Sequence, residues 1–395
     1  MNKTKSVLQK EKKYLLGNYA RPDDFLPVRG KGAYLFDING KRYLDFVDGI
    51  AVNALGYQNP RLNRAVFDQV KKFPHISNLY HNGLDADVAE MLVKHTCADR
   101  AFFCNSGTEA IEAAIKFARR YAARNFARNK IDIITFHNAF HGRTYGALSA
   151  TPQKKYQEDF GPMLAGFKYV PYNDVKALEK AMNSRTAAVL MEFIQGEGGG
   201  ESATPAFASK VASLCRKHKA LLIADEVQSG LGRTGVFMTH QAYHVRPDII
   251  TLAKPIGGGL PLGAVLMSEA VAENIKPGDH GTTFGGNPVA LSVARVMIPI
   301  VSDAKFLAGV RRKGELLRKL LGAVKSANIA QIRGKGLWNC VVVKEKSGDI
   351  IAALRKNGLL TVRGGAEGVR FLPPLTVSEG EIRKAVAIFR KVMRG

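Results

Sequence analysis

The chain has 395 residues, 46% hydrophobic and 23% charged, which is the composition of an ordinary globular protein long enough for two domains. No apolar run approaches the length of a membrane span, and the four cysteines (Cys97, Cys104, Cys215 and Cys340) form no CxxC pair, so we expect no disulfide framework, no zinc site and a cytoplasmic location. The formal net charge of +24 raises the question of a nucleic-acid partner, but lysine and arginine are spread along the chain without an aromatic-basic module, which favours a solvated basic surface that attracts anionic ligands.

The first hundred residues are predicted to hold a charged arm, a hairpin and two helices. Residues 1–14 read as an arm, helical or frayed, that lacks the apolar core of a signal peptide. Two apolar-aromatic runs within residues 31–46 are separated by an Asn-Gly pair, which is a strong hairpin signal. Alternation of polar and apolar residues with helical periodicity predicts helices over residues 60–70 and 86–95.

Apolar runs of strand length alternate with helical stretches through the middle of the chain. The expected strands are residues 101–104, 132–137, 187–194, 220–226 and 249–253. This alternation predicts an α/β fold with a three-layer, mostly parallel sheet in the large domain.

The last hundred residues change character and predict a second, smaller α+β domain that includes the N-terminal arm. The expected elements are strands at residues 332–343 and 368–372, a helix at residues 349–356, and a terminal helix capped by Ser378 and Glu381. The predicted division is residues 1–50 for the arm and part of the small domain, residues 51–288 for the large domain, and residues 289–395 for the rest of the small domain.

Two of the expected strands end in opposite charges. The run at residues 221–224 leads into Asp225 and Glu226, and the run at residues 249–253 leads into Lys254. Open α/β sheets bind ligands outside the carboxyl ends of their strands, and a lone lysine there is usually a solvated charge. Pyridoxal phosphate, however, requires a lysine for its Schiff base and an acid for its pyridine nitrogen. Our central hypothesis is that Lys254 carries this cofactor and that Asp225 pairs with its ring nitrogen.

Two further segments have the chemistry of anion sites. Ser106 and Glu109 are predicted to form a capping box at the start of a helix, and Gly107 would let a phosphate approach the free N–H groups there. Thr282 and Thr283 lie in a glycine-rich loop before another predicted helix, where they could hold a second anion.

Charged and aromatic side chains follow the strand at residues 132–137. Phe140 could stack on a flat heteroaromatic ring, and Arg143 could fork onto a carboxylate. His137 and His141 are four residues apart, but no third ligand stands at metal spacing, so a metal site is not expected.

One arginine and one motif leave alternatives open. Arg370 lies in a strand that should be mostly buried, so it needs an anionic partner, either an acid such as Glu197 or a substrate carboxylate. Residues 230–235 (GLGRTG) fit the GxGxxG pattern, which makes a nicotinamide-dependent dehydrogenase the alternative outside this class. The context is poor, because residues 225–229 separate the strand from the first glycine and no second strand ends in an acid about 20 residues later.

Taken together, these motifs give the chain a close resemblance, over essentially its full length, to the class-III pyridoxal-phosphate aminotransferases of the ornithine/acetylornithine type. The matching segments, in family order, are CNSGTEAIEAAIK, FHNAFHGRTYGALSAT, MEFIQGEGG, LLIADEVQSGLGRTG, PDIITLAKPIGGGLPLGA, HGTTFGGNP and VRFLPPL. GIAVNALGY and HISNLY lean toward the acetylornithine branch. Pro255 after the lysine, and Tyr57 with Gln58, depart from the family pattern; the latter bear on substrate preference rather than on cofactor chemistry.

The resemblance implies a fold type I enzyme, working as a homodimer, with individual roles for its site residues. For the cofactor it implies Lys254 as Schiff base and proton shuttle, Asp225 on the pyridine nitrogen, Gln228 on the phenolic oxygen, Val227 and Phe140 against the ring, Glu226 among the cofactor-binding residues, and Gly107 and Thr108 with Thr283 of the partner subunit on the phosphate. For the substrate it implies Arg143 and Thr282 near a carboxylate, and a Glu197–Arg370 pair that opens for glutamate or 2-oxoglutarate.

The reaction implied by the resemblance is transfer of the ω-amino group of N-acetylornithine to 2-oxoglutarate in arginine biosynthesis. Ornithine, succinylornithine, succinyl-diaminopimelate and 4-aminobutyrate remain alternative donors. A basic nucleic-acid-binding protein on a decayed enzyme fold is disfavoured, because every expected cofactor-site residue is present.

Overall fold

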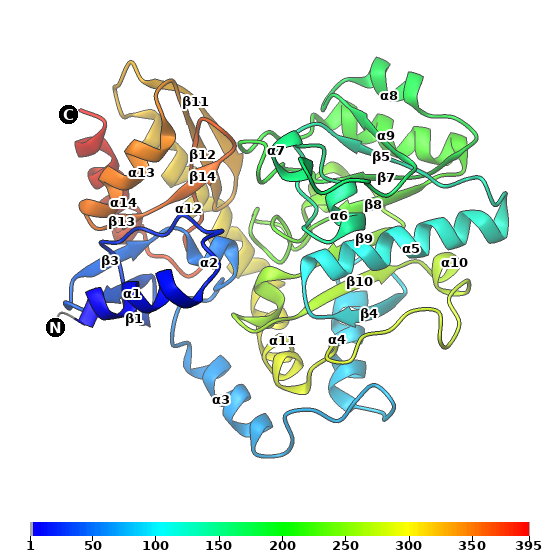
Figure 1. Ribbon diagram of the computed structural model, residues 1–395, viewed down its shortest axis with the longest axis horizontal. Coiled ribbons are helices and arrows are strands. Elements are labelled where there is room, and N and C mark those ends of the chain that lie inside the picture. The colour runs from blue at the N-terminus through cyan, green and yellow to red at the C-terminus, as the bar shows by residue number, and fades with distance from the viewer. Residues whose placement is uncertain (1–2, 395) are drawn as a thin grey trace.

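The computed structural model describes residues 3–394, which form three β-sheets and the helices that surround them (Figure 1). The strands are β1 (Pro27–Lys31), β2 (Tyr34–Asp37), β3 (Arg42–Asp45), β4 (Arg100–Cys104), β5 (Asp132–Phe136), β6 (Phe167–Val170), β7 (Thr186–Met191), β8 (Leu221–Asp225), β9 (Ile249–Leu252), β10 (Gly263–Met267), β11 (Ile329–Lys335), β12 (Trp338–Val343), β13 (Leu359–Leu360), β14 (Val362–Gly364) and β15 (Gly368–Phe371).

The helices are α1 (Lys3–Tyr14), α2 (Asp48–Ala51), α3 (Pro60–Val70), α4 (Gly83–Lys94), α5 (Gly107–Asn125), α6 (Tyr145–Ser149), α7 (Lys154–Gln157), α8 (Val175–Ala181), α9 (Pro205–His218), α10 (Glu269–Ala272), α11 (Pro288–Val301), α12 (Ala304–Gly322), α13 (Ser347–Lys356) and α14 (Glu379–Val392), with two 3-10 helices, η1 (Thr239–Tyr243) and η2 (Lys254–Gly257). From residue 3 to residue 394, no helix is both long and apolar enough to cross a membrane.

The largest sheet has seven strands in the order β4-β10-β9-β8-β7-β5-β6. Strands β5 to β9 pair in parallel, whereas β10 runs antiparallel to both of its neighbours. The predicted mostly parallel α/β sheet is therefore confirmed. The connection between β9 and β10, residues 253–262, is too short for the crossover that a parallel pair requires, which explains why β10 reverses direction.

Alternate residues of the central strands face opposite layers of helices. Ile223 of β8 and Ile249 of β9 are buried in one apolar cluster with residues of α5. Their chain neighbours, Leu222 and Ile250, belong to a second cluster that contains α9 and α11. The two-residue period of a strand thus builds the predicted three layers, with α5 on one side of the strands and α8 and α9 on the other in Figure 1.

The two smaller sheets contain the segments near the chain ends. Their strand orders are β1-β2-β3-β13 and β11-β12-β15-β14. In the first of them β13, late in the chain, pairs in parallel with β3, with Leu359 opposite Leu44. The N-terminal and C-terminal segments therefore share one part of the molecule, on the left in Figure 1. The domain limits at residues 50 and 288 stay a prediction.

Glycines with positive φ form the turns of two β-hairpins. The predicted hairpin within residues 31–46 is formed by antiparallel β2 and β3, and Gly40 in its turn has φ +80°. The single strand predicted over residues 332–343 is wrong, because β11 and β12 form an antiparallel hairpin there. Gly336 makes that turn with φ +54°, and a Cβ on it would come within 2.4 Å of the Thr234 carbonyl carbon.

The GLGRTG segment forms a loop after β8, and no helix begins within it, as a dinucleotide site would require. Its Arg233 is buried and forms an ion pair with the buried Asp48, with Nη2 3.1 Å from Oδ2. Arg233 also donates hydrogen bonds to the backbone carbonyls of Leu337 and Pro373. The motif therefore ties together three distant parts of the chain.

Candidate active site

The two charged strand ends predicted from the sequence meet in one cavity. β8 ends at Asp225, and Lys254 follows shortly after the end of β9, the adjacent parallel strand. Both residues line a cavity of about 460 Å³ at the carboxyl ends of these strands. This volume lies within the range of small-molecule sites.

Lys254 combines a strained backbone with an unpaired amine. Its φ of +43° is rare for a residue with a side chain, and strain of this kind gathers at functional sites. Burial lowers the pKa of the Lys254 ammonium, while the charge of Asp225 opposes that shift. Among the residues that the structure describes, no atom accepts a hydrogen bond from Nζ. The amine is therefore free to act as a nucleophile or to carry a proton.

Asp225 is held by a histidine that the sequence analysis considered only as a metal ligand. His141 Nδ1 lies 2.7 Å from Asp225 Oδ2, and both side chains are buried. The backbone N–H of Val227 and the hydroxyl of Thr251 donate to the other oxygen, Oδ1, at 3.0 and 3.4 Å. No group of three potential metal ligands occurs in the described part of the chain. No feature of the local sequence indicated the pairing of His141 with Asp225.

The start of α5 forms one wall of the cavity. Ser106 caps the helix by accepting a hydrogen bond from the Glu109 N–H at 3.3 Å. The predicted capping box is incomplete: the Glu109 carboxylate accepts from the Asn105 N–H at 2.8 Å and from the Asn105 side chain at 3.0 Å, rather than from the Ser106 N–H. Within residues 3–394, the N–H groups of Gly107 and Thr108 have no acceptor, so they are available to an anion.

A second group of polar residues lies at Gln228, which also lines the cavity. Arg370 is buried and pairs with Glu197, with Nη2 2.9 Å from Oε1. Arg370 Nη1 donates to Gln228 Oε1 at 2.8 Å and to the Gly196 carbonyl at 3.1 Å. The indole N–H of Trp338 donates to the same Gln228 oxygen at 2.9 Å. The structure thus places Glu197, Arg370 and Gln228 together, with Trp338 as an addition that sequence reasoning missed.

Arg143 lies at the exposed edge of the cavity and has no acidic partner among the described residues. Its guanidinium stacks over the ring of Tyr156, 4.0 Å from the centroid, and lies 5.6 Å from that of Phe140. Phe140 and Tyr156 pack edge to face. The Thr108 hydroxyl accepts a hydrogen bond from the Arg143 N–H at 3.2 Å. Arg143 is therefore an oriented cation without a counter-ion, which suits the binding of a carboxylate.

Glu192 is a site residue that the sequence analysis missed. It directly follows β7, next to the strand that ends at Asp225, and its carboxylate accepts hydrogen bonds from the N–H groups of Phe140 and Gly196. Burial raises the pKa of Glu192 to about 7. The expected strand at residues 187–194 placed this acid inside the sheet instead of at its edge.

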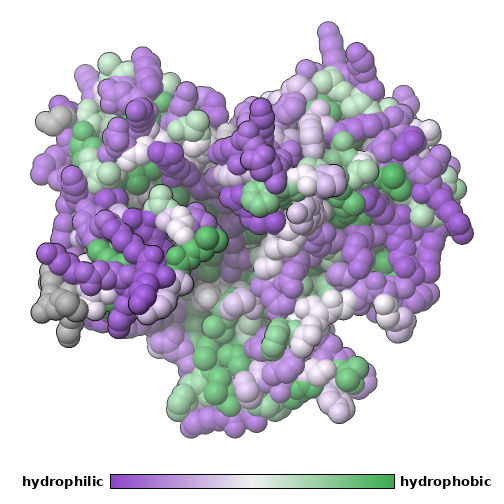
Figure 2. Space-filling model, in the orientation of Figure 1, coloured by the Kyte–Doolittle hydropathy of each residue, from purple (hydrophilic) through white to green (hydrophobic). Residues whose placement is uncertain are grey.

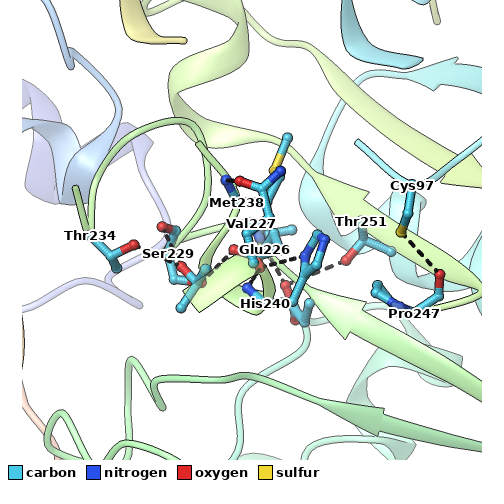
Figure 3. A network of polar contacts seen from close by, with 12 residues as sticks. Cys97, Glu226, Val227, Ser229, Thr234, Met238, His240, Pro247 and Thr251 are labelled. Carbon is cyan, nitrogen blue, oxygen red and sulfur yellow. Dashed lines mark hydrogen bonds and ion pairs between the residues drawn. The ribbon is translucent and has the colours of Figure 1, made fainter. Parts of the chain in front are cut away.

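Three predicted residues lie apart from this cavity. The Glu226 carboxylate faces away, toward the His240 N–H at 2.7 Å and the Ser229 hydroxyl at 3.0 Å (Figure 3). Adjacent residues of an extended chain point to opposite sides, so Asp225 and Glu226 cannot both face the cavity. Thr282 accepts a hydrogen bond from Asn105, and Thr283 is exposed.

The family model for class-III aminotransferases matches residues 18–393. The chain belongs to the class-III aminotransferases. Acetylornithine aminotransferase from Aquifex aeolicus is 44% identical over 382 residues, which cover 96% of this chain and 100% of that protein. Acetylornithine aminotransferase from Bacillus subtilis is 45% identical over 368 residues, covering 92% and 94% of the two chains.

Solved structures agree with this membership. The ornithine aminotransferase from Toxoplasma gondii superposes with a TM-score of 0.95 at 33% identity, and the match covers 100% of this chain and 96% of that one. The N-acetylornithine aminotransferase from Stenotrophomonas maltophilia gives a TM-score of 0.85 at 34% identity, covering 98% of each chain. Class-III aminotransferases depend on pyridoxal phosphate, so this chain is a pyridoxal-phosphate-dependent transaminase of fold type I.

The cavity fits this cofactor on features of its own. It offers an unbonded lysine amine, a buried carboxylate on Asp225, and the free N–H groups at the start of α5. A side chain at position 107 would crowd this wall, because a Cβ on Gly107 would lie 2.8 Å from a methyl of Val227. These groups match the aldehyde, the pyridine nitrogen and the phosphate of the cofactor.

Proposed function

We propose that this class-III aminotransferase transfers the ω-amino group of N-acetylornithine to 2-oxoglutarate, giving N-acetylglutamate 5-semialdehyde and glutamate. Relatives named acetylornithine aminotransferase, 44% and 45% identical over nearly the whole chain, support this substrate. The observation that carries the proposal is an open arginine in the cavity wall, Arg143, and a second arginine, Arg370, held by two lining residues of the same cavity, Glu197 and Gln228. Arg143 is open, whereas Arg370 is closed by Glu197, so a donor needs only one free arginine and a dicarboxylate can use both.

Residues in and next to the cavity would bind the cofactor and move the proton. Pyridoxal phosphate, when bound, supplies an electron-withdrawing ring beside the carbon that carries the amine. Lys254 would bond to the cofactor through Nζ and then hold and return the proton that moves at the substrate carbon. Asp225 would keep a proton on the ring nitrogen, held in orientation by His141.

The remaining cofactor contacts come from the cavity walls. Phe140 and Val227 would pack against the ring, and the free amide N–H group of Gln228 would donate to the phenolic oxygen. Gly107 and Thr108 would hold the phosphate through their N–H groups. Glu226 would support this edge of the sheet through His240, without contacting the cofactor.

Two arginines would bind the carboxylates of the substrates. Arg143 would bind the α-carboxylate of the donor. Thr282 would act from just outside the cavity, through its hydrogen bond with the lining residue Asn105. The Glu197–Arg370 pair would stay closed over the donor and open for the second carboxylate of 2-oxoglutarate or glutamate.

A direct test is turnover on a panel of donors with 2-oxoglutarate. N-acetylornithine should give the highest kcat/KM among acylated and free diamino acids, with glutamate as product. Ornithine is the second candidate, because the Toxoplasma gondii ornithine aminotransferase superposes with a TM-score of 0.95. A preference for ornithine, succinylornithine, succinyl-diaminopimelate or 4-aminobutyrate would replace the proposed donor.

We also propose that the enzyme is a cytoplasmic homodimer, with Thr283 of the partner subunit completing the phosphate site. Large apolar side chains are exposed around this loop, including Leu79, Tyr80 and Phe284. Figure 2 shows further hydrophobic surface over α3 and α11, where Phe67 is exposed. Light scattering should give the mass of two chains, and Phe284→Asp should produce a monomer that binds the cofactor weakly. A monomeric wild-type enzyme with full activity would contradict the shared site.

A further inference from the structure

Trp338, the single tryptophan of the chain, lies next to the active site rather than in the bulk of the core. It is fully buried on β12, and its indole N–H donates to Gln228 Oε1 at 2.9 Å. Arg370 Nη1 donates to the same oxygen at 2.8 Å.

Two donors on one atom fix the orientation of the Gln228 side chain. Tryptophan and arginine can only donate, so the atom that they share must be the amide oxygen. The amide nitrogen then points the other way, and no protein atom in the described part of the chain accepts its hydrogens. Because Gln228 lines the cavity, this nitrogen is the donor that the proposed function assigns to the phenolic oxygen of the cofactor.

The same Arg370 belongs to the substrate switch. Its guanidinium is shared among Glu197, the Gly196 carbonyl and Gln228, and its Nε is buried without a hydrogen-bond partner in the described residues. If Arg370 turns from Glu197 toward a substrate carboxylate, its bond to Gln228 is strained or lost. The cofactor contact would then depend on the donor that does not move.

Trp338 is held rigidly enough to keep its hydrogen bond to Gln228 while Arg370 moves. Its ring packs so closely on Gly200 that a Cβ there would lie 2.5 Å from Cζ3. It belongs to a small apolar cluster with Ile194 and Leu372, and its strand is paired with both β11 and β15.

We propose that Trp338 is a positioning residue that keeps the Gln228 amide aimed at the cofactor while Arg370 exchanges Glu197 for a dicarboxylate. This inference rests on the proposed function, since it assumes that Gln228 contacts the cofactor and that Arg370 serves the acceptor. Loss of Trp338 should therefore slow the half-reaction with 2-oxoglutarate, in which Arg370 leaves Glu197, more than the half-reaction with the amino donor.

The test is Trp338→Phe in the holoenzyme, which keeps an aromatic ring and removes the N–H. Each half-reaction is followed separately by the absorbance of the bound cofactor in single turnovers. The rate with 2-oxoglutarate should fall by about five- to tenfold, the effect of one hydrogen bond, and the rate with N-acetylornithine by less than about twofold. Phe389→Leu is the matched control, because it also reduces a fully buried aromatic side chain but leaves Gln228 untouched. Equal losses in both halves, or the same pattern in the control, would overturn the proposal.

A second readout needs no substrate and so separates this inference from the choice of donor. A donor on the phenolic oxygen stabilises its anion, so loss of that donor should move the pH midpoint of the cofactor absorbance upward. Trp338→Phe should do so with succinate bound, an unreactive dicarboxylate that draws Arg370 from Glu197, and much less in the ligand-free enzyme, where Arg370 still holds Gln228. Gln228→Leu should move the midpoint in both states. In the double variant, Trp338→Phe should add nothing to Gln228→Leu, because it acts through that amide. An unchanged midpoint in Trp338→Phe with succinate bound, or additive shifts in the double variant, would refute the positioning role whatever the amino donor proves to be.

Discussion

His141 Nδ1 lies 2.7 Å from Asp225 Oδ2, and this contact joins the loop after β5 to the end of β8 across 84 positions of sequence. With Val227 and Thr251 also donating, the carboxylate is held from both of its oxygens. A buried carboxylate fixed in this way can face a cationic ring nitrogen without reorienting.

Removing the imidazole should therefore weaken catalysis without emptying the site. His141→Leu should lower kcat by roughly tenfold, the effect of one charge-assisted hydrogen bond. His141→Asn, whose amide can reach the Nδ1 position, should recover part of the loss. Steady-state kinetics on cofactor-saturated enzyme measure this, and equal activity of all three proteins would show that Asp225 needs no positioning.

Lys254→Ala should abolish transamination while the fold is kept. Loss of a proton-carrying group typically costs about 10² to 10⁴ in rate, and loss of the covalent attachment adds to it, so we expect a fall of at least ~10³. The wild-type protein should be yellow, and borohydride should fix the label on Lys254. Thermal unfolding of the variant checks the fold, and appreciable turnover by a folded variant would disprove the role.

Glu192 predicts an unusual dependence of stability on pH. Its pKa is raised to about 7 from the 4.5 of an exposed group, so the folded state holds the proton that the unfolded state has lost. The stabilisation from this proton is complete below about pH 4.5 and disappears as pH rises through 7. Relative to Glu192→Gln, the wild-type holoenzyme should lose about 2–3 kcal/mol between pH 5 and pH 8 in denaturant unfolding. A constant difference over that range would place the pKa elsewhere.

Arg143 and Tyr156 should act on substrate binding. Arg143→Lys removes the fork geometry and should raise KM for the amino donor by about tenfold. Tyr156→Leu removes the stacking contact that orients the guanidinium and should raise KM by about threefold, with kcat nearly unchanged. Tyr145→Leu, at an exposed tyrosine nearby, serves as the control and should have no effect. A fall in kcat without a change in KM would contradict this assignment.

The Arg233–Asp48 pair should matter for stability far more than surface pairs. Asp48 begins a run of positive-φ residues that continues through Gly49, Ile50 and Ala51, so the ion pair fastens a strained segment. Arg233→Met would leave a buried carboxylate unpaired and should lower the free energy of unfolding by about 3–5 kcal/mol. Arg64→Met, which breaks an exposed pair with Asp68, should change it little. Comparable midpoints of urea unfolding for the two variants would refute the contrast.

Local signals in the sequence settled the large sheet and the placement of its principal residues. Continuous apolar runs that alternate with helical stretches marked β5, β7, β8 and β9, because burial on both faces of the sheet demands such runs. Once parallel strands are assigned, their carboxyl ends share one edge, so Asp225 and Lys254 had to lie near each other. The free N–H groups at Gly107 follow in the same way from the capping serine.

Contacts between distant segments were decided only by the tertiary structure. One example is the contact between His141 and Asp225. Another is the single atom of Gln228 that accepts from both Trp338 and Arg370. Both depend on how separate segments pack, which no local period in the sequence encodes. Whether Glu226 faces the cavity or the opposite side depends on where β8 ends, because a shift of one residue along a strand moves every side chain to the other face. The chain's own pattern thus determined the sheet and its reactive edge, and three-dimensional packing chose the partners that orient each group there.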